Sequence, residues 1–323
     1  MSDEFDRIKR LPPYVFEEVN RLKADLRAKG KDIIDFGMGN PDMPTPVHIR
    51  QKLKEVIDKP GVGRYSVSKG INGLRKAQAK YYKKRFNVDL NPSSEIIVTI
   101  GSKEGLANLA QAITSKGDRI LCPDPSYPVH PYGFMIAGGT LRHLPTLHNG
   151  TFNPEEYLKS LARAVSHSVP KPVAVVVSFP SNPTAQLCEL DFYKELVSFA
   201  KKNDLWLLSD LAYAEIYFDG IPPPSILQVE GSKDVAVEFT SLSKTFSMPG
   251  WRMGFAVGNR RLIAALTRIK SYLDYGAFTP VQVAAVAALN GPQGCVEEIR
   301  KTYEKRRDVL VESMARSGWN IPS

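Results

Sequence analysis

Residues 173–184 read Val-Ala-Val-Val-Val-Ser-Phe-Pro-Ser-Asn-Pro-Thr, a run of apolar and β-branched residues that ends in a polar turn. A strand that is apolar at nearly every position, instead of every second one, is typical of a sheet whose two faces are both covered. Similar short runs recur along the chain. They predict further strands at residues 96–100, 119–122, 205–209, 235–240 and 254–257.

Between these strands, apolar residues recur at every third or fourth position, as they do on one face of a helix. The helices predicted in this way cover residues 103–115, 154–167, 189–203 and 260–273, with others at 13–29 and 293–316. Strands that alternate with helices indicate an open α/β domain with a mostly parallel sheet sandwiched by helices.

The pattern divides the chain into three parts. Residues 1–45 hold the first helix and a loop rich in Gly and Pro, residues 46–285 form the α/β domain, and residues 286–323 begin a second, smaller α+β domain. The last predicted helix carries an apolar stripe that includes Val296, Ile299 and Leu310, and such a stripe needs a partner to cover it. We therefore expect the chain to end within this smaller domain.

The composition is that of a globular protein. Of the 323 residues, 43% are hydrophobic and 24% are charged, and no apolar stretch is long enough to cross a bilayer. The N-terminus lacks the apolar segment of a secretory signal. Three widely spaced cysteines without a Cys-x-x-Cys pair argue against a disulfide framework or a zinc ribbon. We expect a cytoplasmic protein without a membrane partner.

The formal net charge of +9 raises the question of nucleic acid. The basic residues are scattered over helical stretches, and no RNA- or DNA-binding motif is present in the sequence. This distribution favours small anionic ligands over nucleic acid. The histidines lack the spacing of a metal site, so no metal is expected.

Polar residues follow four of the predicted strands, at the place where ligands bind in open α/β sheets. They are Ser102 and Lys103 at a helix start, Asn182 in the turn after residue 179, Asp210 and Tyr213 after residue 209, and Ser241, Ser243, Lys244 and Arg252 after residue 240. An amide, a carboxylate with a phenol, and an amine with a guanidinium suit a phosphorylated, nitrogen-containing cofactor that bears a carbonyl group.

The phosphate of such a cofactor has evident ligands. Backbone N–H groups of Ser102 and Lys103 at a helix N-terminus would cradle it. Ser241 and Ser243 would add hydroxyl groups, and Arg252 would add a guanidinium.

The ring of the cofactor has a second set of partners. Asp210 would keep a pyridine nitrogen protonated, and Lys244 would form an imine with the carbonyl and then carry protons at the α-carbon of a substrate. Asn182 and Tyr213 would hydrogen-bond a phenolate oxygen on the ring, and Tyr127 would stack on its face.

The ordered set of these motifs resembles the fold-type-I pyridoxal-phosphate aminotransferases of class I/II, from about Asp32 to Gly318. The motifs are Gly101-Ser-Lys103, Ser181-Asn-Pro-Thr184, Asp210-Leu-Ala-Tyr213, Ser241-Leu-Ser-Lys244 and Gly250-Trp-Arg252. The resemblance implies pyridoxal 5′-phosphate as cofactor and the same roles for the residues named above.

Two further residues take roles only from the resemblance. Tyr65 matches a tyrosine that such enzymes lend to the phosphate of the neighbouring subunit, which implies a homodimer with shared active sites. Gly39 matches the loop that, with Asn182, contacts the substrate.

Within the family, several stretches are most similar to the bacterial glutamate–pyruvate (alanine) aminotransferases, neighbours of the LL-diaminopimelate aminotransferases. They are residues 10–16, 178–186, 210–216 and 270–276, and Ala185 replaces the commoner Gly of the turn, as in that subgroup. The resemblance therefore implies the reaction of L-alanine and 2-oxoglutarate to give pyruvate and L-glutamate.

Other interpretations stay open at this point. Family members carry, beyond the point that matches Ser323, an arginine that binds the substrate α-carboxylate, and no residue here can be assigned that role. The alternatives are an LL-diaminopimelate or aspartate aminotransferase, a lyase that uses the same cofactor, and a shortened chain that binds the cofactor without turnover.

Overall fold

The computed structural model describes residues 5–35 and 39–321 and divides the chain into two compact units, Met1–Asp42 and Met43–Ser323. The first unit contains α1 (Asp6–Lys9) and α2 (Val15–Ala28). Within it, Lys23 Nζ on α2 lies 2.6 Å from a carboxylate oxygen of Asp35.

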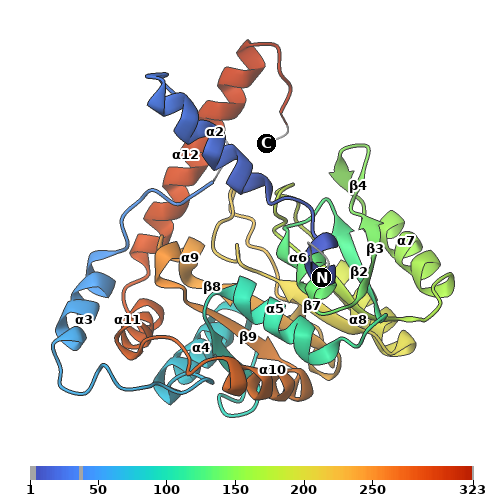
Figure 1. The fold of residues 1–323 in the computed structure, drawn as a ribbon, viewed down its shortest axis with the longest axis horizontal. Coiled ribbons are helices and arrows are strands. Elements are labelled where there is room, and N and C mark those ends of the chain that lie inside the picture. The colour runs from blue at the N-terminus through green and yellow to red at the C-terminus, as the bar shows by residue number, and fades with distance from the viewer. Residues whose placement is uncertain (1–4, 36–38, 322–323) are drawn as a thin grey trace. The chain divides into compact units, whose positions relative to one another are not determined.

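The second unit contains the remaining elements (Figure 1). Its helices are α3 (Val47–Ile57), α4 (Asn72–Phe86), α5 (Ser102–Ile113), α6 (Val129–Ile136), α7 (Pro154–Ser166), α8 (Leu190–Asn203), α9 (Leu242–Thr245), α10 (Arg260–Leu273), α11 (Thr279–Asn290) and α12 (Gly294–Arg316). Its strands are β1 (Ile96–Thr99), β2 (Arg119–Asp124), β3 (Thr140–Pro145), β4 (Leu147–His148), β5 (Thr151–Phe152), β6 (Pro172–Ser178), β7 (Trp206–Asp210), β8 (Ala236–Ser241) and β9 (Gly254–Gly258).

Among the described residues, seven strands form the central sheet in the order β1-β9-β8-β7-β6-β2-β3. Strands β8, β7, β6, β2 and β3 run parallel to one another, and β9 is antiparallel to both β1 and β8. The prediction of an α/β fold with a mostly parallel sheet is therefore confirmed.

The two faces of the sheet pack into two separate cores. Alternate residues of each strand point to opposite faces, so Val175 and Val177 join one core while Ala174 and Val176 join the other. Helices α4, α7, α8 and α11 cover the first face, and α5, α6 and α10 cover the second. This double covering explains why the strands are apolar at almost every position.

The register of the sheet brings the strand ends to one edge. Ser178 pairs with Asp210, and Asp210 pairs with Phe239, so β6, β7 and β8 end at nearly the same level. Gly254, at the start of β9, pairs with Ser241 on one side and with Thr99 on the other. The carboxyl ends of β1 and β8 therefore lie on either side of the first residue of β9.

Each predicted helix and strand is present, with ends within two residues of the prediction. Helices α1, α3, α4, α6, α9 and α11 and strands β3, β4 and β5 have no predicted counterpart. No helix among the described residues has both the length and the apolar character needed to cross a bilayer.

Candidate functional site

Lys244 lies just beyond the end of β8, on the single turn of α9. The Ser241 hydroxyl caps this turn and accepts a hydrogen bond from the Ser243 N–H at 3.1 Å. Lys244 is half-buried, and its Nζ lies 5.9 Å from the centre of the Tyr213 ring. Within the described part of the chain, no carboxylate lies within ion-pair distance of this amine.

Burial lowers the pKa of the Lys244 amine below its ordinary value, and the nearby charge of Arg252 lowers it further. A buried ammonium loses hydration that no counter-ion replaces. A lowered pKa increases the fraction of neutral amine, which is the form that attacks a carbonyl carbon.

The start of helix α5 lies against Arg252, whose charge acts on this lysine. Helix α5 starts at Ser102, directly after Gly101, which has a φ of 84°. A Cβ atom at Gly101 would lie only 2.2 Å from Nη2 of Arg252, so the guanidinium can lie against the helix start only because this residue is glycine. The N–H groups of the first helical turn and the Arg252 guanidinium thus meet at one place, which suits a phosphate.

Asp210, at the end of β7, is buried and held by two donors. Nε2 of His130 donates to its Oδ2 at 2.9 Å, and the Ala212 N–H donates to its Oδ1 at 3.1 Å. Both contacts fix the plane of the carboxylate. The opposite ring nitrogen of His130, Nδ1, is buried and has no hydrogen-bond partner among the described residues.

Asn182 and Tyr213 converge from different strand ends. Nδ2 of Asn182 donates to the Tyr213 hydroxyl at 3.4 Å. Burial raises the pKa of Tyr213, and the charge of Asp210 raises it further. Tyr213 therefore keeps its proton at neutral pH, and its O–H can donate to an anionic oxygen of a ligand.

Tyr127 stands beside the Asp210–His130 pair. Its ring centre is 6.0 Å from that of His130, nearly edge to face, and Lys103 Nζ lies 5.8 Å from the Tyr127 ring centre. An aromatic face next to a carboxylate and a helix N-terminus suits the flat ring of a phosphorylated ligand.

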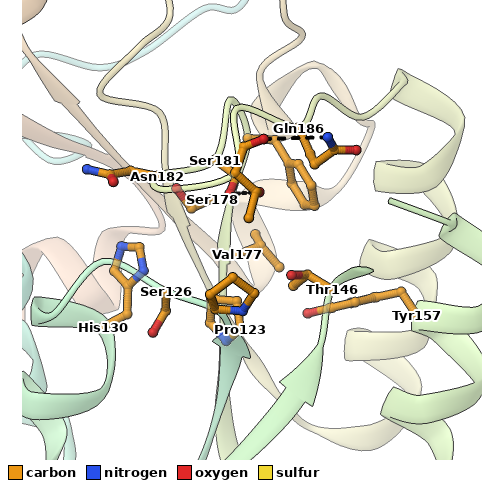
Figure 2. A pocket seen from close by; sticks show the side chains of 13 residues that line it. Pro123, Ser126, His130, Thr146, Tyr157, Val177, Ser178, Ser181, Asn182 and Gln186 are labelled. Carbon is orange, nitrogen blue, oxygen red and sulfur yellow. Dashed lines mark hydrogen bonds between the residues drawn. The ribbon is translucent and has the colours of Figure 1, made fainter. Parts of the chain in front are cut away.

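A pocket next to these groups extends beneath the turn after β6. Figure 2 shows Asn182 and His130 at one end of this pocket, with Ser126 nearby and Tyr157 at the other end. The turn is held closed by a 2.6 Å hydrogen bond between the hydroxyl groups of Ser181 and Thr184. This closure fixes the backbone that carries the Asn182 side chain.

These groups fit pyridoxal 5′-phosphate. The glycine-shaped contact between Arg252 and the start of α5 provides a phosphate cradle. The carboxylate of Asp210 provides a partner for a protonated pyridine nitrogen, and Lys244 provides an amine of lowered pKa for the carbonyl carbon. No three His, Cys, Asp or Glu side chains gather into a metal site within residues 5–35 and 39–321.

One predicted site residue of the second unit, Tyr65, is not joined to this cluster. Tyr65 lies on the surface, 85% exposed, with its ring centre 4.5 Å from that of Tyr275. Gly39 belongs to the first unit, Met1–Asp42, and is exposed there. Ser243 lies beside Ser241, and its side chain is buried.

His130 is the residue of this site that sequence reasoning missed. The spacing of the histidines bears only on metal binding, and His130 has no partner at metal-ligand spacing. A usable signal is its position three residues after Tyr127, which places Tyr127 just before the helix that follows β2 and His130 in its first turn.

Comparison with known proteins identifies relatives of this chain. The family described as aminotransferase class I and II matches residues 31–323. AatC of Rhizobium meliloti, whose name assigns it provisionally to the aminotransferases, is 62% identical over 99% of this chain and 78% of its own length. The glutamate–pyruvate aminotransferase AlaC of Escherichia coli is 52% identical over 98% of this chain and 76% of its own length.

An LL-diaminopimelate aminotransferase of Aquifex aeolicus is 45% identical over 99% of this chain and 82% of its own length. Among solved structures, substrate-bound BacF from Bacillus subtilis superposes with a TM-score of 0.91 at 32% identity, over 100% of this chain and 80% of BacF.

Proposed function

Because the chain belongs to the class I and II aminotransferases, we propose that it transfers the amino group of L-alanine to 2-oxoglutarate, giving pyruvate and L-glutamate. The chain is an aminotransferase that works with pyridoxal 5′-phosphate, and the proposal concerns its substrates. The observation that carries it is the 52% identity to a glutamate–pyruvate aminotransferase, against 45% to an LL-diaminopimelate aminotransferase.

The phosphate is bound, in this proposal, by the backbone N–H groups of Ser102 and Lys103, the hydroxyl groups of Ser241 and Ser243, and the Arg252 guanidinium. Gly101 supports this assignment because a side chain there would collide with the guanidinium. These contacts set the distance of the ring from Lys244.

The ring is held by three further groups. Asp210, oriented by His130, keeps a proton on the pyridine nitrogen. Tyr213 and Asn182 donate hydrogen bonds to the phenolic oxygen, and Tyr127 covers one face of the ring. When bound, the cofactor supplies a ring that takes up electron density from the α-carbon of the substrate.

Lys244 has two roles in the proposed reaction. Its neutral amine would hold the cofactor at the carbonyl carbon, with release of water, and once a substrate amine takes its place the freed amine would carry the proton of the substrate α-carbon. The lowered pKa of this lysine supports both roles, because a neutral amine is required in each. Gly39, with Asn182, contacts the substrate.

We propose a homodimer in which Tyr65 of each copy completes the phosphate site of the other. An exposed apolar and aromatic surface supports this assembly, since Tyr65 packs beside Tyr275 and a soluble monomer rarely leaves such a group uncovered. The exposed members of this surface are Tyr65, Val67, Tyr272, Leu273, Tyr275 and Phe278.

We assign the protein to the cytoplasm, supported by its unpaired cysteines Cys122, Cys188 and Cys295. We propose three parts of the chain: an arm at residues 1–45, the cofactor domain at 46–285 and a segment of a smaller domain at 286–323.

The test is the visible absorbance of the purified chain with pyridoxal 5′-phosphate. L-alanine should bleach the band of the bound cofactor, and 2-oxoglutarate should restore it. A panel with LL-diaminopimelate and L-aspartate ranks the donors by kcat/KM. Preference for LL-diaminopimelate would replace the proposed substrate, and release of pyruvate with ammonia in the absence of an acceptor would indicate a lyase.

A further inference from the structure

Residues 101–103, where helix α5 begins, are called the phosphate turn from here on. A buried lysine, Lys270, contacts the first turn of α5 from the neighbouring helix α10. Helices α5 and α10 lie side by side on the same face of the sheet (Figure 1). The Lys270 side chain on α10 is fully buried, and its Nζ lies 2.8 Å from Glu104 Oε1 and 2.8 Å from Asp274 Oδ2. One ammonium therefore joins two carboxylates that belong to different parts of the fold.

The first carboxylate holds the phosphate turn. Glu104 lies in the first turn of α5, two residues after Ser102, and its Oε2 accepts a hydrogen bond from the Ile100 N–H at 2.8 Å. Asn108 also donates to this carboxylate. Glu104 thus bridges the residue before Gly101 and the helix after it, so it fixes the turn that presents the Ser102 and Lys103 N–H groups.

The second carboxylate holds the segment that carries Tyr65. Asp274 Oδ1 accepts a hydrogen bond from the Gly276 N–H at 2.6 Å, and the backbone carbonyl of Asp274 accepts one from the Ser68 hydroxyl. Gly276 has a φ of 80°, and a Cβ atom there would lie 2.4 Å from the carbonyl oxygen of Val67. Residues 65–68 are thereby fastened against residues 274–276.

We propose that Lys270 is a positioning residue that ties the phosphate turn of its own subunit, through Glu104, to the Tyr65 segment that serves the partner subunit, through Asp274. This inference rests on the proposed homodimer. A lysine without access to water is held in place by its two counter-ions, so a shift of either carboxylate moves the other. Each subunit therefore sets the phosphate geometry of both active sites.

Two isosteric variants test the two ion pairs of Lys270 separately, one with Glu104 and one with Asp274. Glu104→Gln keeps an oxygen that accepts from the Ile100 N–H and loses the charge that pairs with Lys270. Asp274→Asn keeps an oxygen that accepts from the Gly276 N–H and loses the other charge. Each change should weaken the binding of pyridoxal 5′-phosphate on the order of tenfold. It should leave the binding of pyridoxal, which lacks the phosphate, nearly unchanged.

Hybrid dimers show which of the two active sites each ion pair of Lys270 affects. One subunit carries Lys244→Ala, so only the other subunit can hold the cofactor covalently, and differently tagged subunits allow the hybrid to be purified. Because Lys270 couples the two carboxylates, we expect Glu104→Gln to weaken cofactor binding most when it lies on the subunit with intact Lys244. In the other placement it acts through Lys270 on the Tyr65 segment, and the effect should be smaller. Asp274→Asn should act most when it lies on the Lys244→Ala subunit, which supplies Tyr65 to the intact site, and less in the opposite placement, where it acts through Lys270 on Glu104.

The first readout is the affinity for pyridoxal 5′-phosphate, measured from its absorbance. The second is the ratio of this affinity to the affinity for pyridoxal, and the third is the melting temperature of the cofactor-free hybrid. A large effect in one placement and a smaller one in the other, with the order reversed between the two variants, supports the proposal. An effect confined to one placement would show that the two carboxylates act independently and would overturn the link through Lys270. Equal effects in both placements, or equal losses of pyridoxal and pyridoxal 5′-phosphate, would reduce Lys270 to a structural role and overturn it. Failure of the tagged wild-type subunits to associate contradicts the homodimer, and with it the link from Lys270 through Asp274 to the partner's active site. Failure of wild-type dimers to bleach with L-alanine contradicts only the substrate assignment.

Discussion

Two lysines of this protein are withdrawn from solvent, and their surroundings are opposite. Lys270 is fully buried and lies 2.8 Å from each of two carboxylates. Lys244 is half-buried, has an aromatic ring and an arginine for neighbours, and has no carboxylate at ion-pair distance among the described residues. Burial alone therefore does not decide what a lysine does.

The difference lies in which side chains surround the amine. At Lys270 two carboxylates pair with the side chain, which then acts as a fixed link between α10, α5 and the 274–276 turn. Burial beside Arg252 disfavours the charge at Lys244 and lowers the pKa of its amine. The first environment stabilises structure, and the second prepares a nucleophile at a cost in stability.

The largest expected effect is on activity. Lys244→Ala should lower the rate of transamination by at least about 10³-fold, because the variant loses both the nucleophile and the proton carrier at the α-carbon. The cofactor should still bind through its phosphate and Asp210. The measurement is turnover of L-alanine with 2-oxoglutarate, with Lys194→Ala on the exposed face of α8 as the control. Turnover within tenfold of wild type would show that Lys244 is not the reactive lysine.

The same substitution at the two sites should change stability in opposite directions. Lys270→Met leaves two carboxylates without their shared cation and should lower the free energy of unfolding by about 3 kcal/mol. Lys244→Met removes a charge that is destabilised by burial, and at pH 7 it should raise the melting temperature.

The pH dependence tests the sign at Lys244. The folded-state pKa is lowered, so the unfolded state holds more protons between the folded pKa and the ordinary value of 10.5. The loss of folding stability caused by the buried Lys244 charge is complete below the folded-state pKa. It disappears as the pH rises from that pKa to 10.5. The stability gain from Lys244→Met should shrink in parallel. Urea unfolding of the cofactor-free protein, at one fixed protein concentration, gives the free energy of unfolding of each variant. Lys194→Met is the neutral reference. A gain that persists above pH 10.5 would point to improved packing instead of a lost charge.

The sequence predicts one of these two environments and not the other. Lys244 follows an apolar strand in a motif with Ser241 and Ser243, and parallel strands end at a common edge, so local pattern and topology suffice. Lys270 is one of several basic residues on a helix, and such residues usually face water. What buries it is the packing of α10 on α5, which depends on the tertiary arrangement and leaves no local signature.

The same reasoning explains which elements were predicted. The strands beside Asn182, Asp210 and Ser241 are continuous apolar runs and were located within two residues. Helix α6, which carries His130, reads Val-His-Pro-Tyr-Gly-Phe-Met-Ile, and its Pro and Gly mask any helical period. The partner of Asp210 was therefore missed although Asp210 itself was found.

Arg252 offers a way to divide the causes of the lowered pKa at Lys244. Burial is the larger cause and the charge of Arg252 the smaller, so Arg252→Met should raise the pKa of the amine without restoring its ordinary value. Arg252→Lys, which keeps the charge, is the control. The pH dependence of covalent pyridoxal attachment to the cofactor-free protein reports the pKa of Lys244. At pH 8 the attachment should be severalfold slower in Arg252→Met, because less of the amine is neutral. A pKa that returns fully to 10.5 would assign the whole shift to charge.

The smallest expected effect concerns the ring beside Lys244. Tyr213→Phe keeps the aromatic face, whose centre is 5.9 Å from the amine, and removes the hydroxyl that accepts a hydrogen bond from Asn182. The loss of one hydrogen bond of about 1 kcal/mol should lower kcat roughly fivefold. Tyr213→Leu, which also removes the ring, should lower it further. Tyr217→Phe is the matched control, because Tyr217 lies in the same loop and contacts Arg300 through its ring, 3.8 Å from the guanidinium carbon. If Tyr213→Phe and Tyr213→Leu lose the same activity, the ring contributes nothing to the surroundings of Lys244, and burial and Arg252 alone distinguish it from Lys270.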